Sequence, residues 1–282
     1  MTIPFVAEVS SNHHQNLDRC LAFIDAAAAM GCDAVKFQLF RINELFAPEI
    51  LTKSAQHRQR RQWELPVEFI PQLALRCAEK GIRFGCTPFY LDAARELEPY
   101  VAFYKIASYE LLWDDLLTAC AATGKPVVLA TGMADADEVE HAVATLRRAG
   151  CGELTLLHCV SAYPAPPEEC NLAAIGSLRE RHGCAVGWSD HSVSSAVIGR
   201  AVHRWGAEMV EFHLDLDGRG EEFSGGHCWL PGPMGDLIAS VKSAMAADGD
   251  GIKKPTAAEL ADRAWRADPA DGLRPLRDIR ET

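Results

Sequence analysis

The chain has 282 residues, 48% of them hydrophobic, so it is long enough for one large core and short for two independent domains. Its formal charge of −11, from 28 basic and 39 acidic residues, argues against a nucleic-acid surface, because phosphate binding needs clustered Lys and Arg. No apolar run approaches the roughly 20 residues that span a bilayer, and the N-terminal MTIPFVAEVS lacks a basic region followed by an apolar one. We therefore expect a soluble cytoplasmic protein with small-molecule partners and no membrane or nucleic-acid partner.

Short β-branched or aromatic runs alternate with longer helical patterns along the chain, an order typical of βα units with a parallel sheet. The predicted strands are Pro4 to Ser10, Ala34 to Leu39, Arg83 to Phe89, Phe103 to Ser108, Pro126 to Gly132, Leu154 to Val160, Ala185 to His191 and Met209 to Leu216. Six of the helical patterns between and after them end in glycine, at Gly31, Gly81, Gly124, Gly150, Gly183 and Gly206. Eight βα units can close on themselves, and no GxGxxG follows the first strand. The sequence predicts an α/β fold, a (β/α)8 TIM barrel, rather than an open doubly wound sheet.

Two long connections and a tail interrupt the regular alternation. The segments Arg41 to Pro66 and Asp217 to Pro233 follow the second and eighth strands, so both should lie over the active-site end of the barrel. The tail is rich in Arg, Asp, Pro and Ala and has no strand signal. We expect a catalytic barrel over residues 1–252 and a C-terminal extension over 253–282 that packs on its outside.

Ten cysteines are spread singly through the chain, with no CxxC pair. Five of them, Cys20, Cys32, Cys77, Cys120 and Cys159, lie in apolar periodic segments, so we expect buried reduced thiols. Cys86, Cys159 and Cys228 fall near the proposed active-site end, but no partner base is visible for any of them.

Polar residues at the carboxyl ends of barrel strands point toward the active site, and this chain has many of them. They are Glu8, Lys36, Gln38, Thr87, Lys105, Ser108, Tyr163, Ser189, Asp190, His191, Glu211 and His213. A lone strand histidine is more often a hydrogen-bonded core residue than a ligand. Adjacent strands lie about 4.8 Å apart, however, so His191 and His213 could reach one divalent ion, Mn, Mg, Fe or Zn. Asp190 and Glu211 flank these ligands and would then orient them.

Lys36 and Lys105 occupy strand interiors, although lysine is nearly always exposed to solvent. A bound phosphate or carboxylate is the natural partner of two such ammonium groups, with the hydroxyls of Thr87, Ser108, Ser161 and Ser189 as further donors. Internal ion pairs with Glu8 or Glu110 are the alternative. A Schiff-base lysine fits less well, since that chemistry needs one desolvated lysine and no metal.

These residues form a pattern that resembles the sialic acid (N-acetylneuraminate) synthase family. The resemblance rests on AEVSSNH (residues 7–13), VKFQ (35–38), CTPF (86–89), YKIASYE (104–110), GKPVVLATGM (124–133), LLHCVSAYP (156–164), VGWSDH (186–191) and VEFH (210–213). The motifs occur in the family's order over the whole predicted barrel. The resemblance implies a metal-dependent transferase that condenses phosphoenolpyruvate with an N-acylated hexosamine aldehyde, giving a nonulosonic acid and phosphate.

The resemblance also implies a role for each site residue. His191 and His213 would hold the divalent metal, Mn2+ first, with Mg2+, Fe2+, Co2+ and Zn2+ as alternatives. The catalytic group would comprise Glu8, Lys36, Lys105, Glu211 and Asp190, with Glu8 as the candidate for proton transfer. Substrate contacts would come from Gln38, Thr87, Ser108, Ser161, Tyr163, Ser189 and His227.

Three departures from the family pattern bear mainly on the sugar acceptor. Ala130 stands where the family's LSTGM motif has serine, and Gly226 stands where its GPDH motif has aspartate, while His227 is kept. We also expect no antifreeze-like C-terminal domain, which in the family supplies an arginine to the acceptor. Candidates for the missing contacts are Arg58, Arg60, Arg61, Arg219 and the tail arginines, although most charged loop residues are simply solvated.

Two other functions stay open at this point. One is a metal-dependent aldolase or lyase that acts on a pyruvyl substrate without phosphate. The other is a non-catalytic barrel scaffold, against which the presence of both histidines and both lysines argues. A homo-oligomer is possible, although the family's dimer depends partly on the domain expected to be missing.

Overall fold

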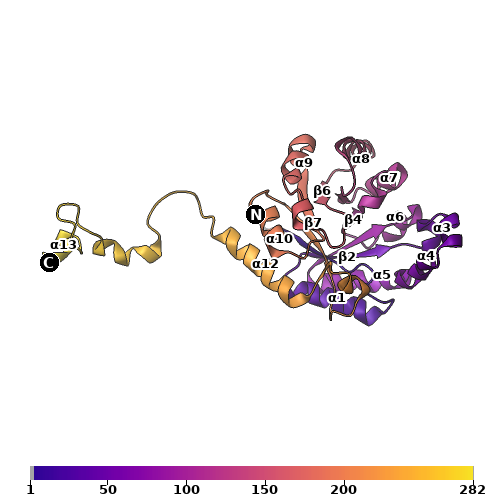
Figure 1. Cartoon of the computed structure of the whole chain (residues 1–282), viewed down its shortest axis with the longest axis horizontal. Coiled ribbons are helices and arrows are strands. Elements are labelled where there is room, and N and C mark those ends of the chain that lie inside the picture. The colour runs from indigo at the N-terminus through magenta and orange to yellow at the C-terminus, as the bar shows by residue number, and fades with distance from the viewer. Residues whose placement is uncertain (1–2, 282) are drawn as a thin grey trace. The chain divides into compact units, whose positions relative to one another are not determined.

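The computed structural model describes residues 3–281, so Met1, Thr2 and Thr282, at the outer ends of the two predicted domains, lie outside the described residues. Eight parallel strands follow one another around the sheet: β1 (Phe5–Glu8), β2 (Ala34–Leu39), β3 (Arg83–Pro88), β4 (Phe103–Ile106), β5 (Val127–Ala130), β6 (Leu154–Cys159), β7 (Ala185–Asp190) and β8 (Val210–Leu214). Strand β8 also pairs with β1, which closes the barrel. Figure 1 shows the helices arranged around the strands. The predicted TIM barrel and all eight predicted strands are confirmed.

Most of the strands end one or two residues earlier than predicted. Strand β4 stops at Ile106 because Ser108–Glu110 form a 3₁₀ turn, and β7 stops at Asp190, one residue before His191. The polar pattern continues past these strand ends because Glu110 and His191 are still buried at the end of the barrel, although the ladder hydrogen bonds have ceased. Burial pattern and strand pairing therefore end at different residues.

A helix follows each strand along the chain. The principal helices are α1 (Leu17–Ala29), α5 (Ile70–Lys80), α6 (Leu91–Leu97), α7 (Asp114–Ala122), α8 (Ala136–Arg148), α9 (Ala174–His182), α10 (Ser195–His203) and α12 (Pro231–Ala246). All six glycines predicted to close helical segments have positive φ. Gly81 shows the reason: its φ of 70° lets its N–H return to carbonyls of the last turn of α5.

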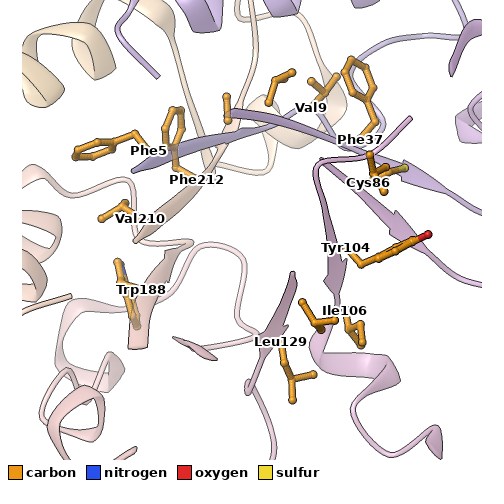
Figure 2. Packing of buried hydrophobic residues seen from close by; sticks show 14 of the residues in the cluster. Phe5, Val9, Phe37, Cys86, Tyr104, Ile106, Leu129, Trp188, Val210 and Phe212 are labelled. Atoms are coloured by element: carbon orange, nitrogen blue, oxygen red, sulfur yellow. The ribbon is translucent and has the colours of Figure 1, made fainter. Parts of the chain in front are cut away.

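Side chains of the strands alternate between two cores. One core lies between strands and helices and contains Phe5, Phe37, Tyr104 and Trp188 (Figure 2). The other is a separate buried cluster, and its members come largely from alternate strand positions: Val6, Ala34, Phe103, Val128, Leu157 and Met209. This second cluster fills the barrel interior, because strand side chains alternate with a period of two.

The polar residues follow the same alternation. Glu8, Lys36, Lys105 and Glu211 each lie two residues beyond a member of the interior cluster, so their side chains occupy the next layer inside the barrel. Glu8 is also the direct neighbour of Lys36 in the pairing of β1 with β2. Strand register therefore brings charged groups together above an apolar floor.

The two long connections contain short elements of their own. The second loop forms α2 (Ile42–Leu45), α3 (Pro48–Lys53), α4 (Ala55–Gln59) and a 3₁₀ turn, Arg60–Trp63. The eighth loop forms α11 (Glu221–Ser224) and β9 (Cys228–Trp229). Strand β9 was not predicted; it pairs with His213 and Leu214, which β7 leaves free because its own pairing with β8 ends at Phe212.

Contact density divides the chain into two compact units, Met1–Ser243 and Ala244–Thr282. Within the described part of the second unit, the elements after the end of α12 are short helical turns such as α13 (Arg277–Arg280). The predicted packing of the tail on the barrel stays a prediction. No helix among residues 3–281 is long and apolar enough to cross a membrane. All ten cysteines are free in the structure, and eight of them are buried, so the expected burial is confirmed for these eight, while their reduced state stays a prediction.

One glycine of the barrel provides a test of packing. An added Cβ on Gly187 would overlap the carbonyl oxygen of Met209 and lie 2.7 Å from Leu157 Cδ2. We expect Gly187→Ala to lower the free energy of unfolding by about 3 kcal/mol or more, because a backbone atom cannot move aside easily. Gly176→Ala is the control: nothing lies within 4 Å of its Cβ in α9, so the change should stabilise the protein by about 0.5–1 kcal/mol. Urea unfolding of both variants gives the comparison, and equal effects would contradict the packing argument.

Candidate active site

A cavity of about 750 Å³ opens at the carboxyl ends of the barrel strands. Ten of the fourteen predicted site residues line it: Lys36, Gln38, Lys105, Ser108, Tyr163, Ser189, His191, Glu211, His213 and His227. Glu8 and Thr87 do not line it but both contact Lys36. Both predicted loops over this end contribute to the wall, through residues such as Phe46 and Glu222.

Two buried lysines and two buried carboxylates form an ionic network at the base of the cavity. The ammonium group of Lys36 contacts Glu8 and donates to the hydroxyl of Thr87 at 3.0 Å. Lys105 donates to Glu211 Oε1 at 3.1 Å, while Glu211 Oε2 lies 4.0 Å from Lys36. The expected alternative of an internal ion pair with Glu8 thus holds for Lys36, but Lys105 contacts Glu211 rather than the expected Glu110.

Burial and neighbouring charge shift the pKa values of this network. Burial lowers the pKa of Lys36 to about 7, and Lys105 adds to this while Glu211 opposes it. Burial alone would raise the pKa of Glu211, but Lys105 and Lys36 outweigh it, and the pKa is lowered. Glu211 is therefore ionised, whereas Lys36 can change protonation near neutral pH.

Additional hydrogen bonds fix the two carboxylates in place. Glu211 Oε1 also accepts from the hydroxyl of Ser189 at 3.1 Å. Glu8 Oε1 accepts from the N–H of Ser10 at 2.7 Å and from the amide of Gln38 at 3.2 Å. Both acids are held in one orientation, which is the condition for a positioned proton acceptor.

His191 and His213 both line the cavity and pack edge-on against each other, with ring centroids 5.4 Å apart. His191 Nδ1 lies 2.7 Å from the carbonyl oxygen of Val160, which can only accept, so Nδ1 carries the proton and Nε2 keeps a lone pair. His213 Nδ1 lies 2.9 Å from Glu222 Oε2. Burial and the nearby His213 lower the pKa of His191 to about 3, so this ring is neutral.

A neutral imidazole whose second nitrogen is hydrogen-bonded to a carbonyl or carboxylate is the usual arrangement of a metal-binding histidine. His191 meets this description, His213 makes the corresponding contact from Nδ1 to the carboxylate of Glu222, and both rings line the same cavity. The donor set therefore fits a divalent cation held through the two Nε2 atoms, with other positions left for water or substrate.

Glu222 is the site residue that the sequence did not reveal. Its carboxylate contacts His213, lies 3.5 Å from His227 Nε2 and accepts from the hydroxyl of Ser11 at 2.6 Å. The sequence contains two adjacent acidic residues in the eighth loop, Glu221 and Glu222, and does not indicate which of the two carboxylates points into the cavity. Candidate ligand atoms of four residues lie within 4.8 Å of one another: His213, Glu222, His227 and Cys228. Side chains of the eighth loop could therefore also bind a cation together with His213.

Asp190, predicted as catalytic, lies outside the cavity lining and is fully buried. Its two oxygens accept from the indole N–H groups of Trp188 at 3.1 Å and Trp229 at 3.0 Å, and from the hydroxyl of Ser192 at 2.6 Å. The period of two explains the difference, because Ser189 faces the interior and Asp190 therefore faces the helix layer. Asp190 holds the start of the seventh loop, and with it the backbone of His191.

Two of the four predicted hydroxyls, those of Ser108 and Ser161, lie around Gly132, two residues beyond the end of β5. The N–H of Gly132 donates to Ser108 Oγ at 2.9 Å, and Ser108 Oγ lies 3.2 Å from Cys159 Sγ. Ser161 Oγ is buried without a hydrogen-bond partner. An added Cβ on Gly132 would overlap Ser161 Oγ, so only glycine leaves room here. An unpaired buried hydroxyl beside a glycine is suited to receive an oxygen atom of a ligand.

Tyr163 covers the histidines from the solvent side. Its ring centroid lies 4.3 Å from that of His191 and 5.0 Å from that of His227. The ring is 41% exposed although it lines the cavity. Tyr163 is thus placed at the boundary between the metal-binding groups and the open part of the cavity.

Glu110 also lines the cavity, and burial raises its pKa to about 7, with Lys105 opposing the shift. Because the folded state holds this proton more tightly than the unfolded state, its stabilising contribution is present below about pH 4.3 and is lost as pH rises through 7. We expect Glu110→Gln to reduce the fall in unfolding free energy between pH 5 and 8 by up to about 3 kcal/mol. Urea unfolding at both pH values tests this, with Glu140→Gln, exposed on α8, as control. An unchanged pH dependence in Glu110→Gln would contradict it.

Comparison with known proteins gives concordant matches. The sequence profile of the NeuB family matches residues 23–253, which span β2 to β8 and both long loops. The chain is 32% identical over 276 residues to the spore coat polysaccharide biosynthesis protein SpsE of Bacillus subtilis, covering 94% of this chain and 74% of that one. It is 33% identical over 267 residues to the N,N'-diacetyllegionaminic acid synthase of Campylobacter jejuni, covering 90% of this chain and 80% of that one.

A solved structure agrees with these sequence matches. The crystal structure of N-acetylneuraminic acid synthetase from Leptospira borgpetersenii, in complex with citrate, superposes with a TM-score of 0.82. The sequences are 30% identical, and the match covers 93% of this chain and 90% of that one.

Proposed function

The chain belongs to the NeuB family, and from this we propose that it condenses phosphoenolpyruvate with the aldehyde form of an N-acylated hexosamine-like sugar, giving a nonulosonic acid and phosphate. Family membership confirms the resemblance seen in the sequence motifs and makes the chain a sialic acid synthase-like enzyme. The acceptor, the metal and the cytoplasmic location expected from the sequence are parts of the proposal.

One observation carries the proposal: two buried lysines and two buried histidines converge on a single cavity. Lys36 and Lys105 can hold the carboxylate and phosphate of phosphoenolpyruvate, because each presents an ammonium group inside a water-poor site. The hydroxyls of Ser108 and Ser161 lie together beside Gly132 as further donors for ligand oxygen atoms.

His191 and His213 would hold a divalent metal, Mn2+ in the first instance. When bound, such an ion polarises the aldehyde of the acceptor and stabilises negative charge on its oxygen. The formal charges of the site support the need for a divalent cation. The site has three carboxylates, those of Glu8, Glu211 and Glu222, and two lysines, Lys36 and Lys105. Without a divalent cation the site has no excess positive charge for the phosphoenolpyruvate anion.

The proposed reaction balances in two stages. The C3 carbon of phosphoenolpyruvate forms a bond to the aldehyde carbon, and the aldehyde oxygen becomes a hydroxyl group by taking up a proton. Water adds to the cationic C2 to give a C2 hydroxyl, and when the C2–O bond to phosphate then breaks, this hydroxyl becomes a carbonyl and its proton leaves with the phosphate. At the addition step the water gives up its other proton to a base. Glu8 is the candidate to accept that proton, because its carboxylate is buried, held by Ser10 and in contact with Lys36.

The test is phosphate release by the purified protein with Mn2+, phosphoenolpyruvate and a panel of N-acylated and free hexoses. We expect release with N-acylated acceptors, together with a nonulosonic acid detected by mass spectrometry. No release with any acceptor, despite bound metal, would contradict the proposal. A metal-dependent aldolase or lyase would instead form product from pyruvate and be indifferent to phosphoenolpyruvate.

A further inference from the structure

The second loop forms a distinct wall of the cavity, made by Phe46, His57, Arg60 and Trp63, which we call the Arg60 wall. The guanidinium carbon of Arg60 lies 5.5 Å from the ring centroid of Phe46 and 5.4 Å from that of Trp63. The ring of His57 packs edge-on against Phe46 at 4.8 Å. A planar cation is therefore held between aromatic side chains at the edge of the cavity.

Arg60 is distinguished from its neighbours by an unused donor. Its Nε is buried without a hydrogen-bond partner, and no other arginine in residues 3–281 has such an atom. Arg58 donates to the carbonyl oxygens of Leu51 and Thr52, and Arg61 donates to the side chain of Asn43. An unsatisfied buried donor costs about 1–3 kcal/mol, so Arg60 differs from a solvated loop arginine.

The backbone of the Arg60 wall is anchored by the first loop and by the start of the second. Gln15 donates from its side chain to the carbonyl oxygen of Arg61 at 3.0 Å and to that of Glu64 at 2.9 Å. The carboxylate of Glu64 accepts from the N–H of Ile42 at 2.7 Å. Arg60 is thus positioned before any ligand arrives, which reduces the entropy lost on binding.

The chemistry of the wall favours a neutral carbonyl group over an anion. A phosphate needs several donors, but the only other basic side chain in the wall is His57, whose Nδ1 is already bonded to Ser54 Oγ at 2.7 Å. A carbonyl oxygen needs one or two N–H donors, and a small apolar group beside it can pack on the rings of Phe46 and Trp63. A free ammonium group would be repelled by the guanidinium.

We propose that Arg60 is the residue that selects an N-acylated acceptor, with its guanidinium donating to the acyl carbonyl oxygen and the acyl methyl group packing on the aromatic rings. This inference rests on the proposed function for the identity of the acceptor. It concerns only the sugar side of the cavity, so phosphoenolpyruvate binding at Lys36 and Lys105 stays unchanged when Arg60 is replaced.

The experiment compares Arg60→Gln with Arg61→Gln, an exposed control in the same loop. Binding of N-acetylmannosamine, mannosamine and N-acetylmannosamine 6-phosphate is measured by calorimetry on the metal-loaded protein, with phosphoenolpyruvate titrated separately. Wild type and Arg61→Gln should bind the N-acetylated sugar at least tenfold more tightly than mannosamine. Arg60→Gln should lose this preference and keep its affinity for phosphoenolpyruvate.

Each other outcome overturns the inference. The first is a preference for the N-acetylated sugar that survives in Arg60→Gln. The second is a wild type that shows no such preference or no saturable binding of an N-acetylated sugar. The third is a loss of affinity in Arg60→Gln that is seen only with N-acetylmannosamine 6-phosphate. The proposed function is tested separately, by phosphate release. If wild type releases no phosphate but shows an N-acyl preference that depends on Arg60, the proposed reaction fails and the acyl-binding role stands.

Discussion

Glu8→Gln should lower kcat for phosphate release by about 10³-fold, the size typical for loss of a positioned acid–base group. Glutamine keeps one oxygen for the N–H of Ser10, but its amide cannot replace the ion pair with Lys36. Because burial already lowers the pKa of Lys36 to about 7, loss of its partner carboxylate lowers that pKa further and discharges the lysine. The variant therefore loses both a proton acceptor and a cation. Steady-state phosphate release with saturating phosphoenolpyruvate measures the effect.

Stability must be separated from catalysis in this experiment, because breaking a buried ion pair by removing one partner costs about 3–5 kcal/mol. The double variant Glu8→Gln, Lys36→Met removes both charges and should recover part of that stability while remaining inactive. Glu140→Gln, which changes an exposed acid on α8, should behave as wild type in both assays. Activity of folded Glu8→Gln within threefold of wild type would refute the assignment.

His191→Ala should abolish metal binding at micromolar ion concentration and lower kcat by at least about 10³-fold. The loss of one outer hydrogen-bond partner of a ligand already weakens metal binding by roughly 10–100-fold, and here a ligand itself is removed. Val160 holds the His191 ring only through its carbonyl oxygen, so the alanine variant should fold. Metal per chain after dialysis, and Mn2+ titration by calorimetry, measure the loss.

The control is His141→Ala, an exposed histidine that contacts Asp114 at 2.9 Å on the helix layer. It should keep full metal content and activity. Full metal content in His191→Ala, combined with loss in His227→Ala or Glu222→Gln, would instead assign the ion to the eighth-loop group that contains Cys228. That result would correct the predicted ligand set without altering the fold.

Residues with a local signal were predicted well. Strand alternation placed Lys36, Lys105 and Glu211 inside a barrel, since a charged residue that replaces an interior hydrophobic one faces the same way as its neighbours two positions away. The same rule, applied to Asp190, predicts that its side chain points away from the cavity, because the adjacent Ser189 faces inward. The error came from treating every polar residue at a strand end as part of the site.

Loop residues had no comparable signal. Glu222 and Arg60 lie in the two long connections, where no period dictates which side of the chain faces the cavity. Strand β9 is only two residues long, and it forms because β7 ends early and leaves part of β8 unpaired. Such pairing depends on neighbours distant in the sequence.

The sequence by itself determined the barrel, the inward-facing charged residues and the two candidate metal-binding histidines, because each follows from strand period and strand order. Only the tertiary structure decided which groups meet. Lys105 contacts Glu211 across 106 positions of sequence, His213 contacts Glu222 from a neighbouring loop, and Arg60 alone among the loop arginines Arg58, Arg60 and Arg61 has a buried N–H without a hydrogen-bond partner. These contacts depend on closure of the barrel and on loop conformation, and neither of these produces a periodic pattern in the sequence.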